Sequence, residues 1–304
     1  MKNSEISVSI ITLTYNNFNE LKATIESVLS QLYDNVSNVE YIIADDCSSC
    51  FDKDWILQTI KETSQLGSGV SDINVYTHDK NLGTVRAFNK AIGQASGDII
   101  IPLSCGDQFF SKNSVNEIIQ SFKKTSLPMV TGFREIVDGK TVIAKVPRRQ
   151  LVKLFDKGNE RKLLKTLATR GNFISGACTY YSKNFLKEIG GFDERFRLLE
   201  DYPMYLRALN RGYGIAFTKK TLMKHTVGGV SDLSRPVDKV LSQDFERARS
   251  WIWVNVSMNI FEKRLFRYFQ VFKKKERLSL TNLIRYPDCF VYWGLLAIKI
   301  RILS

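Results

Sequence analysis

Cysteine is scarce in this 304-residue sequence, which has five, at positions 47, 50, 105, 178 and 289. An odd and scattered set does not build a disulfide framework, so it favours a reducing compartment. Cys47 and Cys50 have the spacing of a redox motif, but no second pair accompanies them as a zinc site requires. The flanking residues are not those of a thioredoxin either. We therefore expect two free thiols in a loop.

Long apolar runs are lacking as well. Polar residues interrupt the run 6–13 and no basic region precedes it, so we expect no secretory signal. The most apolar late stretch, 289–300, is about half as long as a membrane span. No Gly-x-Gly-x-x-Gly motif follows the first predicted strand, which excludes a dinucleotide-dependent oxidoreductase.

Positive charge is abundant and unevenly distributed. The formal net charge is +13, which favours anionic partners such as phosphorylated substrates, acidic lipid surfaces or nucleic acid. The segment 261–304 holds ten Lys and Arg residues against three acidic ones, so it carries +7 of that charge (10 − 3). The 44% hydrophobic content fits an ordinary globular core.

Strand and helix patterns alternate along the N-terminal third of the chain. Runs of β-branched residues predict strands, and apolar residues spaced three or four apart predict helices. The predicted strands cover 6–13, 39–44, 75–77 and 98–103, and the helices between them cover 21–32, 54–62 and a segment that starts after Gly83 and stops at Gly97. This alternation predicts an α/β fold with a Rossmann-like, doubly wound, mostly parallel sheet.

The rest of the sequence divides into two parts near residue 237. Before that point we expect a helix over 114–124, a hairpin of 128–137 with 140–146, a helical stretch over 149–168, a helix over 201–210, a strand over 215–217 and a Gly-rich loop over 225–231. After it, aromatic residues mix with basic ones on predicted helices. The sequence thus predicts an α/β domain over 1–237 and a basic, aromatic, helical appendage over 238–304.

Acidic side chains gather in three places, each of which we predict to lie at the end of a strand. They are Asp45 with Asp46, the lone Asp107, and Glu200 with Asp201. Ligands of open α/β sheets bind beyond the carboxyl ends of the strands. Carboxylates gathered there can bind a base or a metal ion and can accept a proton. The sequence therefore predicts a ligand site at this edge of the sheet.

Six motifs occur in order along about 6–231. They lie at 8–17, 43–48, 81–91, 95–103, 190–194 and 200–201. In this order and at these spacings, the sequence resembles the family 2 glycosyltransferases, which are inverting, nucleotide-sugar-dependent enzymes of the GT-A fold. The resemblance implies that 1–237 is the catalytic domain.

The resemblance implies a nucleotide-sugar site around the first strand ends. The turn of Thr14, Tyr15 and Asn16 would contact the nucleobase, with the Tyr15 ring stacked on uracil or thymine. Asp46 would accept the base N–H, with Asp45 in support. A plain strand-to-helix turn and a solvated acidic pair are the alternatives.

The same resemblance implies contacts to the ribose and diphosphate. Asn81, Gly83 and Arg86 lie where the family touches these groups, and the Arg fork suits phosphate. Arg86 could instead be a surface residue of its helix. Ser104 belongs to the same donor site. His225 lies where the family closes over the donor, so it contacts phosphate or metal or is structural.

Asp107 falls on the family's metal-binding aspartate, which implies Mn²⁺ or Mg²⁺ as a bridge to the diphosphate. The sequence departs from the family pattern because Gly106 stands where a further carboxylate is usual. One carboxylate with phosphate oxygens and waters still suits these cations. The loss also leaves open a catalytically silent GT-A-like binding module that supports a partner transferase.

Asp201 matches the family's general base. It would take a proton from the acceptor hydroxyl as that oxygen attacks the anomeric carbon in one inverting displacement. Glu200 would orient the loop or contact the acceptor. The alternative is an acidic pair that favours a helix dipole, and both can hold together.

The appendage combines basic residues with aromatic rings, which suits an anionic membrane surface; a helical subdomain packed on the core is the alternative. No nucleic-acid-binding motif is present, so we do not expect nucleic acid as a partner. The resemblance and the basic, aromatic appendage together predict transfer from a UDP- or dTDP-sugar to a hydroxyl of a lipid-linked bacterial glycan, such as capsule or O-antigen. We expect a cytoplasmic protein, peripheral at the inner face of the plasma membrane.

Overall fold

The computed structural model describes residues 6–34, 36–64, 68–139, 141–226 and 238–303. The strands are β1 (Ile6–Thr14), β2 (Val36–Asp45), β3 (Asp72–Thr77), β4 (Ile99–Ser104), β5 (Asp107–Phe109), β6 (Met129–Asp138), β7 (Thr141–Val146), β8 (Thr179–Ser182) and β9 (Ile215–Thr226). The helices are α1 (Leu21–Leu29), α2 (Lys53–Ser64), α3 (Thr84–Gln94), α4 (Ser114–Thr125), α5 (Glu160–Arg170), α6 (Lys183–Ile189), α7 (Asp201–Asn210), α8 (Lys239–Asn255), α9 (Ile260–Phe266), α10 (Lys274–Arg277), α11 (Leu280–Arg285) and α12 (Pro287–Leu303).

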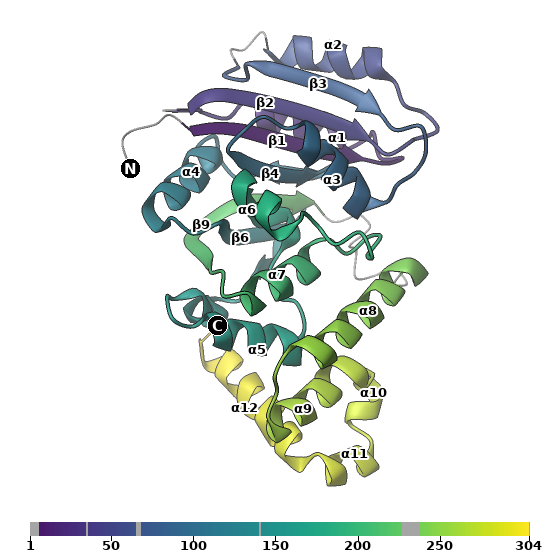
Figure 1. Ribbon diagram of the computed structural model, residues 1–304, viewed down its shortest axis with the longest axis vertical. Helices are drawn as coiled ribbons and strands as arrows, with labels where there is room; N and C mark the ends of the chain where they lie inside the picture. Colours follow the sequence, from purple (N-terminus) through teal and green to yellow (C-terminus); the bar gives the residue numbers. More distant parts are fainter. Residues whose placement is uncertain (1–5, 35, 65–67, 140, 227–237, 304) are drawn as a thin grey trace.

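The strands form one sheet in the order β3-β2-β1-β4-β8-β6-β9-β5, with β7 paired to β6. Figure 1 shows the first four strands of this order, from β3 at the top to β4. In its first half, β1 pairs in parallel with β2 and β4, and β2 pairs in parallel with β3. Parallel neighbours need long crossovers, and α1, α2 and α3 lie in these connections. The predicted α/β fold with a Rossmann-like first half is confirmed.

The second half of the sheet mixes the two strand directions. β8 is antiparallel to β4 and β6, β9 is parallel to β6, and the short β5 is antiparallel to β9. β6 and β7 form the expected antiparallel hairpin. This arrangement brings β5, which follows β4 after two residues, to the far edge beside β9.

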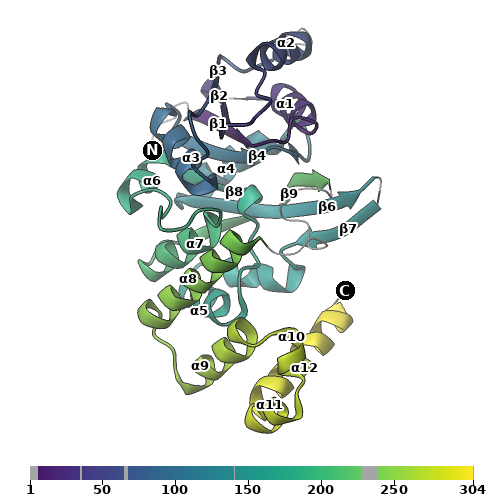
Figure 2. The same cartoon turned by 90° about the vertical axis from the view of Figure 1, so that its right-hand side faces the viewer.

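Helices cover both faces of the sheet, as a doubly wound fold requires. Along β1, Ile10 belongs to the core cluster on one face and Ile11 to the cluster on the other, as the two-residue period of a strand dictates. The first cluster contains apolar residues of α1, α2 and α4, and the second contains those of α3, α5, α6 and α7. Figure 2 shows α1 and α3 on opposite sides of the strands.

The expectation of one helical stretch over 149–168 is wrong. A 3-10 turn over Arg149–Phe155 is followed by the separate helix α5. Gly158, with φ of +88°, lies between them. A left-handed backbone of this kind interrupts a right-handed helix, and glycine adopts it without strain.

The expected strand over 215–217 is too short, because β9 continues to Thr226. Its later residues are rich in Thr and Lys and lack the apolar pattern that predicts a strand. They nevertheless pair with β6 on one side and with β5 on the other. His225 therefore lies in a strand instead of opening a Gly-rich loop. The Gly228 and Gly229 part of that expected loop lies outside the described residues.

The predicted C-terminal helical appendage is present as α8–α12, which lie at the end of the molecule remote from β3 (Figures 1 and 2). Its first helix is not separate from the core, since Ala248 and Ile252 of α8 are buried in the cluster that also holds α7. Farther along, Leu265, Tyr268 and Tyr286 form a small cluster of their own. The division into 1–237 and 238–304 stays a prediction.

Among the described residues, no helix is both long enough and apolar enough to cross a membrane.

Close packing at the start of β4 gives a stability prediction. A Cβ at Gly97 would lie 2.4 Å from the backbone nitrogen of Ser9 and 2.5 Å from the carbonyl carbon of Val8. Because backbone atoms of a central strand cannot move aside, we expect Gly97→Ala to lower the free energy of unfolding by about 3 kcal/mol. Urea denaturation measures this change.

Gly93→Ala is the matched control, because Gly93 is an exposed residue of α3 with nothing within 4 Å of a new Cβ. Alanine favours a helix over glycine, so this variant should gain about 0.5–1 kcal/mol. Equal stability of the two variants would contradict the packing argument.

Candidate active site

The carboxyl ends of three parallel strands meet at one edge of the sheet. Thr14 at the end of β1 pairs with Asp45 at the end of β2, and Leu13 pairs with Ser104 at the end of β4. Asp46 follows directly and donates its N–H to the Thr14 carbonyl at 2.9 Å. The structure thus brings Thr14, Asp45, Asp46 and Ser104 together, where ligands of α/β sheets bind.

The two acidic residues of this edge hold neighbouring loops. Asp45 is fully buried and accepts hydrogen bonds from Ser48 N at 2.7 Å, Ser48 Oγ at 2.5 Å and Thr77 Oγ1 at 2.7 Å. The two carboxylate oxygens of Asp46 accept Leu82 N and Gly83 N, each at 2.8 Å. Asp46 therefore fixes the loop that contains Gly83, and its remaining lone pairs stay available to a nucleobase N–H.

Tyr15 and Asn16 form the turn beyond β1. The Tyr15 side chain is 52% exposed, so its ring is free to stack on a base. Asn16, with φ of +49°, donates its N–H to Ser48 Oγ at 2.7 Å and accepts Ser49 N on its side-chain oxygen at 3.1 Å. The turn is thereby anchored on the loop that Asp45 shapes.

His78 is a buried residue of this edge that sequence reasoning missed. It lies directly after β3, and neither ring nitrogen has a hydrogen-bond partner among the described residues. Burial lowers its pKa, which favours the neutral ring. The Oγ1 of Thr14 is also buried, and no partner for it lies in the described part of the chain. Position after the third parallel strand was the signal that could have identified His78.

Asp107 lies at the start of β5, opposite His225 in the antiparallel pair with β9. Its Oδ1 is 2.9 Å from Nη2 of Arg134 and 2.8 Å from Nδ1 of His225. Arg134, on β6, was missed because the sequence indicated only a hairpin strand there. A buried carboxylate, a guanidinium and an imidazole therefore form one cluster.

The residues present give a divalent cation only part of a site. Among the described ranges, no group of three or more His, Cys, Asp and Glu side chains is placed to hold a metal ion. Within the described ranges, Asp107 and His225 are the side chains of this cluster that could bind a cation. Position 106 leaves little room for a further side chain, because a Cβ at Gly106 would lie 2.2 Å from Oε2 of Glu20. Mg²⁺ and Mn²⁺ accept one or two protein ligands completed by phosphates and waters, so the pair fits with a diphosphate present.

Asp201 lies in the first turn of α7, which is the helix expected over 201–210. The expectation that this acidic pair ends a strand is wrong. Its Oδ1 accepts Tyr202 N at 2.6 Å and its Oδ2 accepts the side-chain amide of Asn172 at 2.9 Å. A Cβ at Gly176 would lie 2.9 Å from Oδ2 of Asp201, so a glycine is needed for this close approach. Asn172, like His78 and Arg134, is a residue that the sequence did not indicate.

Burial raises the pKa of Asp201, and the bonds from Tyr202 and Asn172 oppose that rise. Burial also raises the pKa of Glu200, and the neighbouring charge of Asp201 raises it further. Because the two carboxyl groups are neighbours, ionisation of one disfavours ionisation of the other. A buried carboxyl group with a raised pKa has the property that a general base needs.

Side chains bridge the three acidic places. Nη1 of Arg134 is 3.5 Å from Oγ of Ser175, which precedes the glycine against Asp201. On the other side, Nη2 of Arg197 donates to Oδ1 of Asn81 at 2.7 Å. These bonds connect the chain segments that carry Asp46, Asp107 and Asp201.

Arg86 is not among these contacts. Its side chain is 59% exposed on α3, and Nε is 3.5 Å from Oε2 of Glu194. The arrangement matches the alternative that Arg86 is a surface residue of its helix.

A sheet of this topology, with acidic groups at the ends of its parallel strands and a buried carboxylate on an adjoining helix, defines an α/β protein of the GT-A class. The chain belongs to Glycosyl transferase family 2, whose sequence model matches residues 9–190.

Similar proteins agree with this assignment. The poly-beta-1,6-N-acetyl-D-glucosamine synthase of Staphylococcus aureus is 26% identical over 228 residues, which cover 73% of this chain and 52% of the relative. The chain thus spans about half the length of the curated relatives it matches. TarS of S. aureus in complex with UDP-GlcNAc aligns with a TM-score of 0.62 at 16% identity, covering 93% of this chain and 79% of TarS.

GalNAc-T7, solved with UDP, GalNAc and Mn²⁺, aligns with a TM-score of 0.58 at 14% identity, covering 94% of this chain and 54% of that protein. At these identities the two structures show a shared fold, which confirms the expected GT-A class.

The environment of Asp201 gives a prediction about its titration. The Asn172 amide stabilises the ionised carboxylate, so Asn172→Ala should raise the pKa of Asp201 by about one further unit. Carboxyl ¹³C chemical shifts followed against pH measure this change. Asn159→Ala is the control, since that amide bonds the Lys153 carbonyl instead. An unchanged or lower pKa in Asn172→Ala would contradict the assignment.

Proposed function

We propose that this chain is an inverting glycosyltransferase that moves a sugar from a UDP- or dTDP-sugar to a hydroxyl of a lipid-linked bacterial surface glycan. The observation that carries the proposal is the buried, amide-bonded carboxylate of Asp201 beside a nucleotide-type sheet edge. Family membership supports it. So do a similar polysaccharide synthase and a similar fold solved with UDP-GlcNAc.

The donor would lie along the carboxyl edge of β1, β2 and β4. In this arrangement the exposed Tyr15 ring stacks on the base, and Asp46 accepts the base N–H while it holds the loop at Gly83. Uracil and thymine both present an N–H to such an acceptor, which is why the proposal includes UDP and dTDP. Thr14, Asn16, Asn81 and Ser104 complete the wall of this donor site.

The chemical step would be a single displacement. The acceptor oxygen attacks the anomeric carbon and its proton passes to Asp201. The bond from that carbon to the diphosphate breaks, and the nucleoside diphosphate leaves with the electron pair. Attack from the face opposite the leaving group inverts the anomeric configuration. Glu200 would orient the loop or contact the acceptor.

Negative charge develops on the diphosphate as it leaves. Arg134, paired with Asp107 at 2.9 Å, would add positive charge on that side of the site. Mn²⁺ or Mg²⁺ would be held by Asp107 with His225, and such a cation neutralises a leaving diphosphate when bound.

Replacement of the base separates binding from catalysis. We expect Asp201→Asn to bind UDP as the wild type does and to lose about 10²- to 10⁴-fold in transfer rate, since a general base contributes that much. Calorimetric titration of UDP and dTDP, with release of nucleoside diphosphate from sugar donors as the activity assay, measures both. Wild-type binding without transfer to any acceptor would favour the silent binding module.

The same titration tests the cation. With Mn²⁺ or Mg²⁺ the wild type should bind nucleotide more tightly than with EDTA, and Asp107→Ala should lose that difference. Equal wild-type binding with and without metal would show that Arg134 and the backbone suffice.

We propose that the appendage serves the acceptor side by contacting an anionic membrane at the inner face of the cell. Its helices expose a group of large apolar side chains, namely Trp253, Val254, Ile260, Phe261, Leu278, Leu280, Ile284, Phe290, Val291, Trp293 and Leu295. Exposed basic residues lie among them, including Lys273, Lys274, Lys275 and Arg285. Apolar rings and cations side by side suit the headgroup region of an anionic bilayer.

Vesicle sedimentation tests this surface. In α11, Leu280 and Ile284 are 75% and 74% exposed, and changing both to Ser should lower binding to phosphatidylglycerol vesicles by at least tenfold. Each buried methylene contributes about 0.8 kcal/mol, so burial of about two of the lost groups already accounts for a tenfold change. Val142→Ser with Ile143→Ser is the control, because those exposed residues lie on β7. Equal loss in both double variants would contradict a specific surface.

A further inference from the structure

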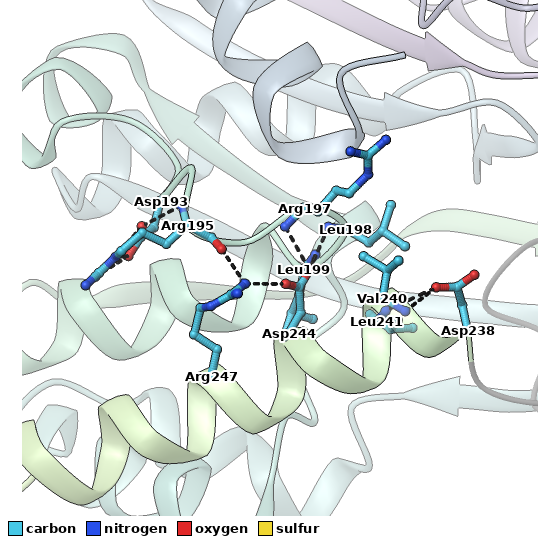
Figure 3. A network of polar contacts seen from close by, with 10 residues as sticks. All are labelled: Asp193, Arg195, Arg197, Leu198, Leu199, Asp238, Val240, Leu241, Asp244 and Arg247. Atoms are coloured by element: carbon cyan, nitrogen blue, oxygen red, sulfur yellow. Dashed lines mark hydrogen bonds and ion pairs between the residues drawn. The ribbon is translucent and has the colours of Figure 1, made fainter.

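Asp244, on α8 of the appendage, points into the catalytic domain and is 1% exposed. Its Oδ2 accepts three consecutive backbone N–H groups, from Arg197 at 2.9 Å, Leu198 at 2.7 Å and Leu199 at 3.2 Å. Its Oδ1 accepts Nη1 of Arg247 at 3.0 Å. Figure 3 shows these bonds converging on the one carboxylate.

The segment that Asp244 holds is not part of a helix or a strand. The amides of residues 197–200 therefore have no ladder or helix partners. Buried amides need an acceptor, and here one charged side chain serves three of them. Asp201 follows within two residues of Leu199. The backbone that leads into the proposed base is therefore shaped around Asp244.

The same segment also touches the proposed donor site. The Arg197 carbonyl accepts Val85 N at 3.2 Å, and its guanidinium donates to Asn81 Oδ1 at 2.7 Å. A Cβ at Gly83 would lie 2.6 Å from Cγ of Arg197, so the two chain segments are in close contact. One short stretch of backbone thus joins the donor loop to the base.

We propose that Asp244 is a positioning residue, which sets the place of Asp201 relative to the donor loop by holding the amides of residues 197–199. The inference rests on the proposed function, in which Asp201 is the base. Displacement of a reacting group by about 1 Å can cost about 10²-fold in rate, so loss of this anchor should be visible in catalysis. The C-terminal helices would then be part of the catalytic unit.

A neighbouring aspartate of the same helix shows what an ordinary structural role looks like. Asp238 accepts Val240 N at 2.7 Å and Leu241 N at 3.2 Å, which caps the start of α8 (Figure 3). Among the described residues, its side-chain bonds stay within its own helix. The backbone amides that bond to the Asp244 side chain all belong to the segment before Asp201. Asp238 and Asp244 therefore form a matched pair for a test.

The test compares Asp244→Ala, Asp244→Asn and Asp238→Ala in the full chain. Phe196 and Leu199 remain buried in the core cluster, so Asp244→Ala should still fold and bind UDP. We expect amide hydrogen exchange at residues 197–199 to accelerate at least tenfold in Asp244→Ala. Transfer kcat should fall by about 10- to 100-fold. Asp244→Asn keeps one oxygen acceptor and should recover part of both losses.

The donor KM should change less than kcat in Asp244→Ala, because Asp46 still holds the donor loop through Leu82 and Gly83. Asp238→Ala should leave exchange at 197–199 and kcat as in the wild type. If Asp244→Ala matches Asp238→Ala in both measurements while the wild type transfers sugar, the positioning role is overturned alone. A wild type that binds UDP and transfers nothing overturns the proposed function, and the inference with it.

Discussion

Parallel pairing of β1 with β2 and β4 is the constraint on which the candidate site depends. Hydrogen bonds of the ladder fix the register, so Thr14, Asp45 and Ser104 end at one edge in neighbouring positions. The strands are buried on both faces, and helices supply the apolar cover. Since the interior is filled by these helices, the strand ends are the part of the sheet left free to contact a ligand.

The acidic residues of the site differ in what surrounds them. Asp45 and Asp46 accept hydrogen bonds from backbone amides and a hydroxyl of neighbouring loops. These bonds fix the conformation of the loops. Asp201 accepts the Tyr202 N–H and the Asn172 amide, yet its burial still raises its pKa, and burial with the charge of Asp201 raises that of Glu200. Desolvation thus outweighs the hydrogen bonds at Asp201, which is the property that the proposed role as a base requires.

The C-terminal helices are tied to the α/β fold by two kinds of contact. Ile252 of α8 lies in the apolar cluster that includes Tyr202 of α7, and Gln270 donates to the Tyr202 hydroxyl at 3.1 Å. Asp244 adds charge-assisted bonds to the backbone before α7. The amino-acid composition changes sharply near residue 238. The packing is continuous, because both apolar and polar contacts join the helices after that residue to the α/β fold before it.

Local patterns in the chain were enough to predict the alternation of strands and helices, the family, and Asp45 at the end of a strand, because periodicity and short motifs involve residues that are close in sequence. Packing of the elements was needed to show that β9 continues to Thr226, that Arg134 pairs with Asp107, and that Asp244 bonds to the segment before Asp201. These contacts join residues far apart in the chain, and no local pattern encodes which donor will meet which acceptor once the elements pack.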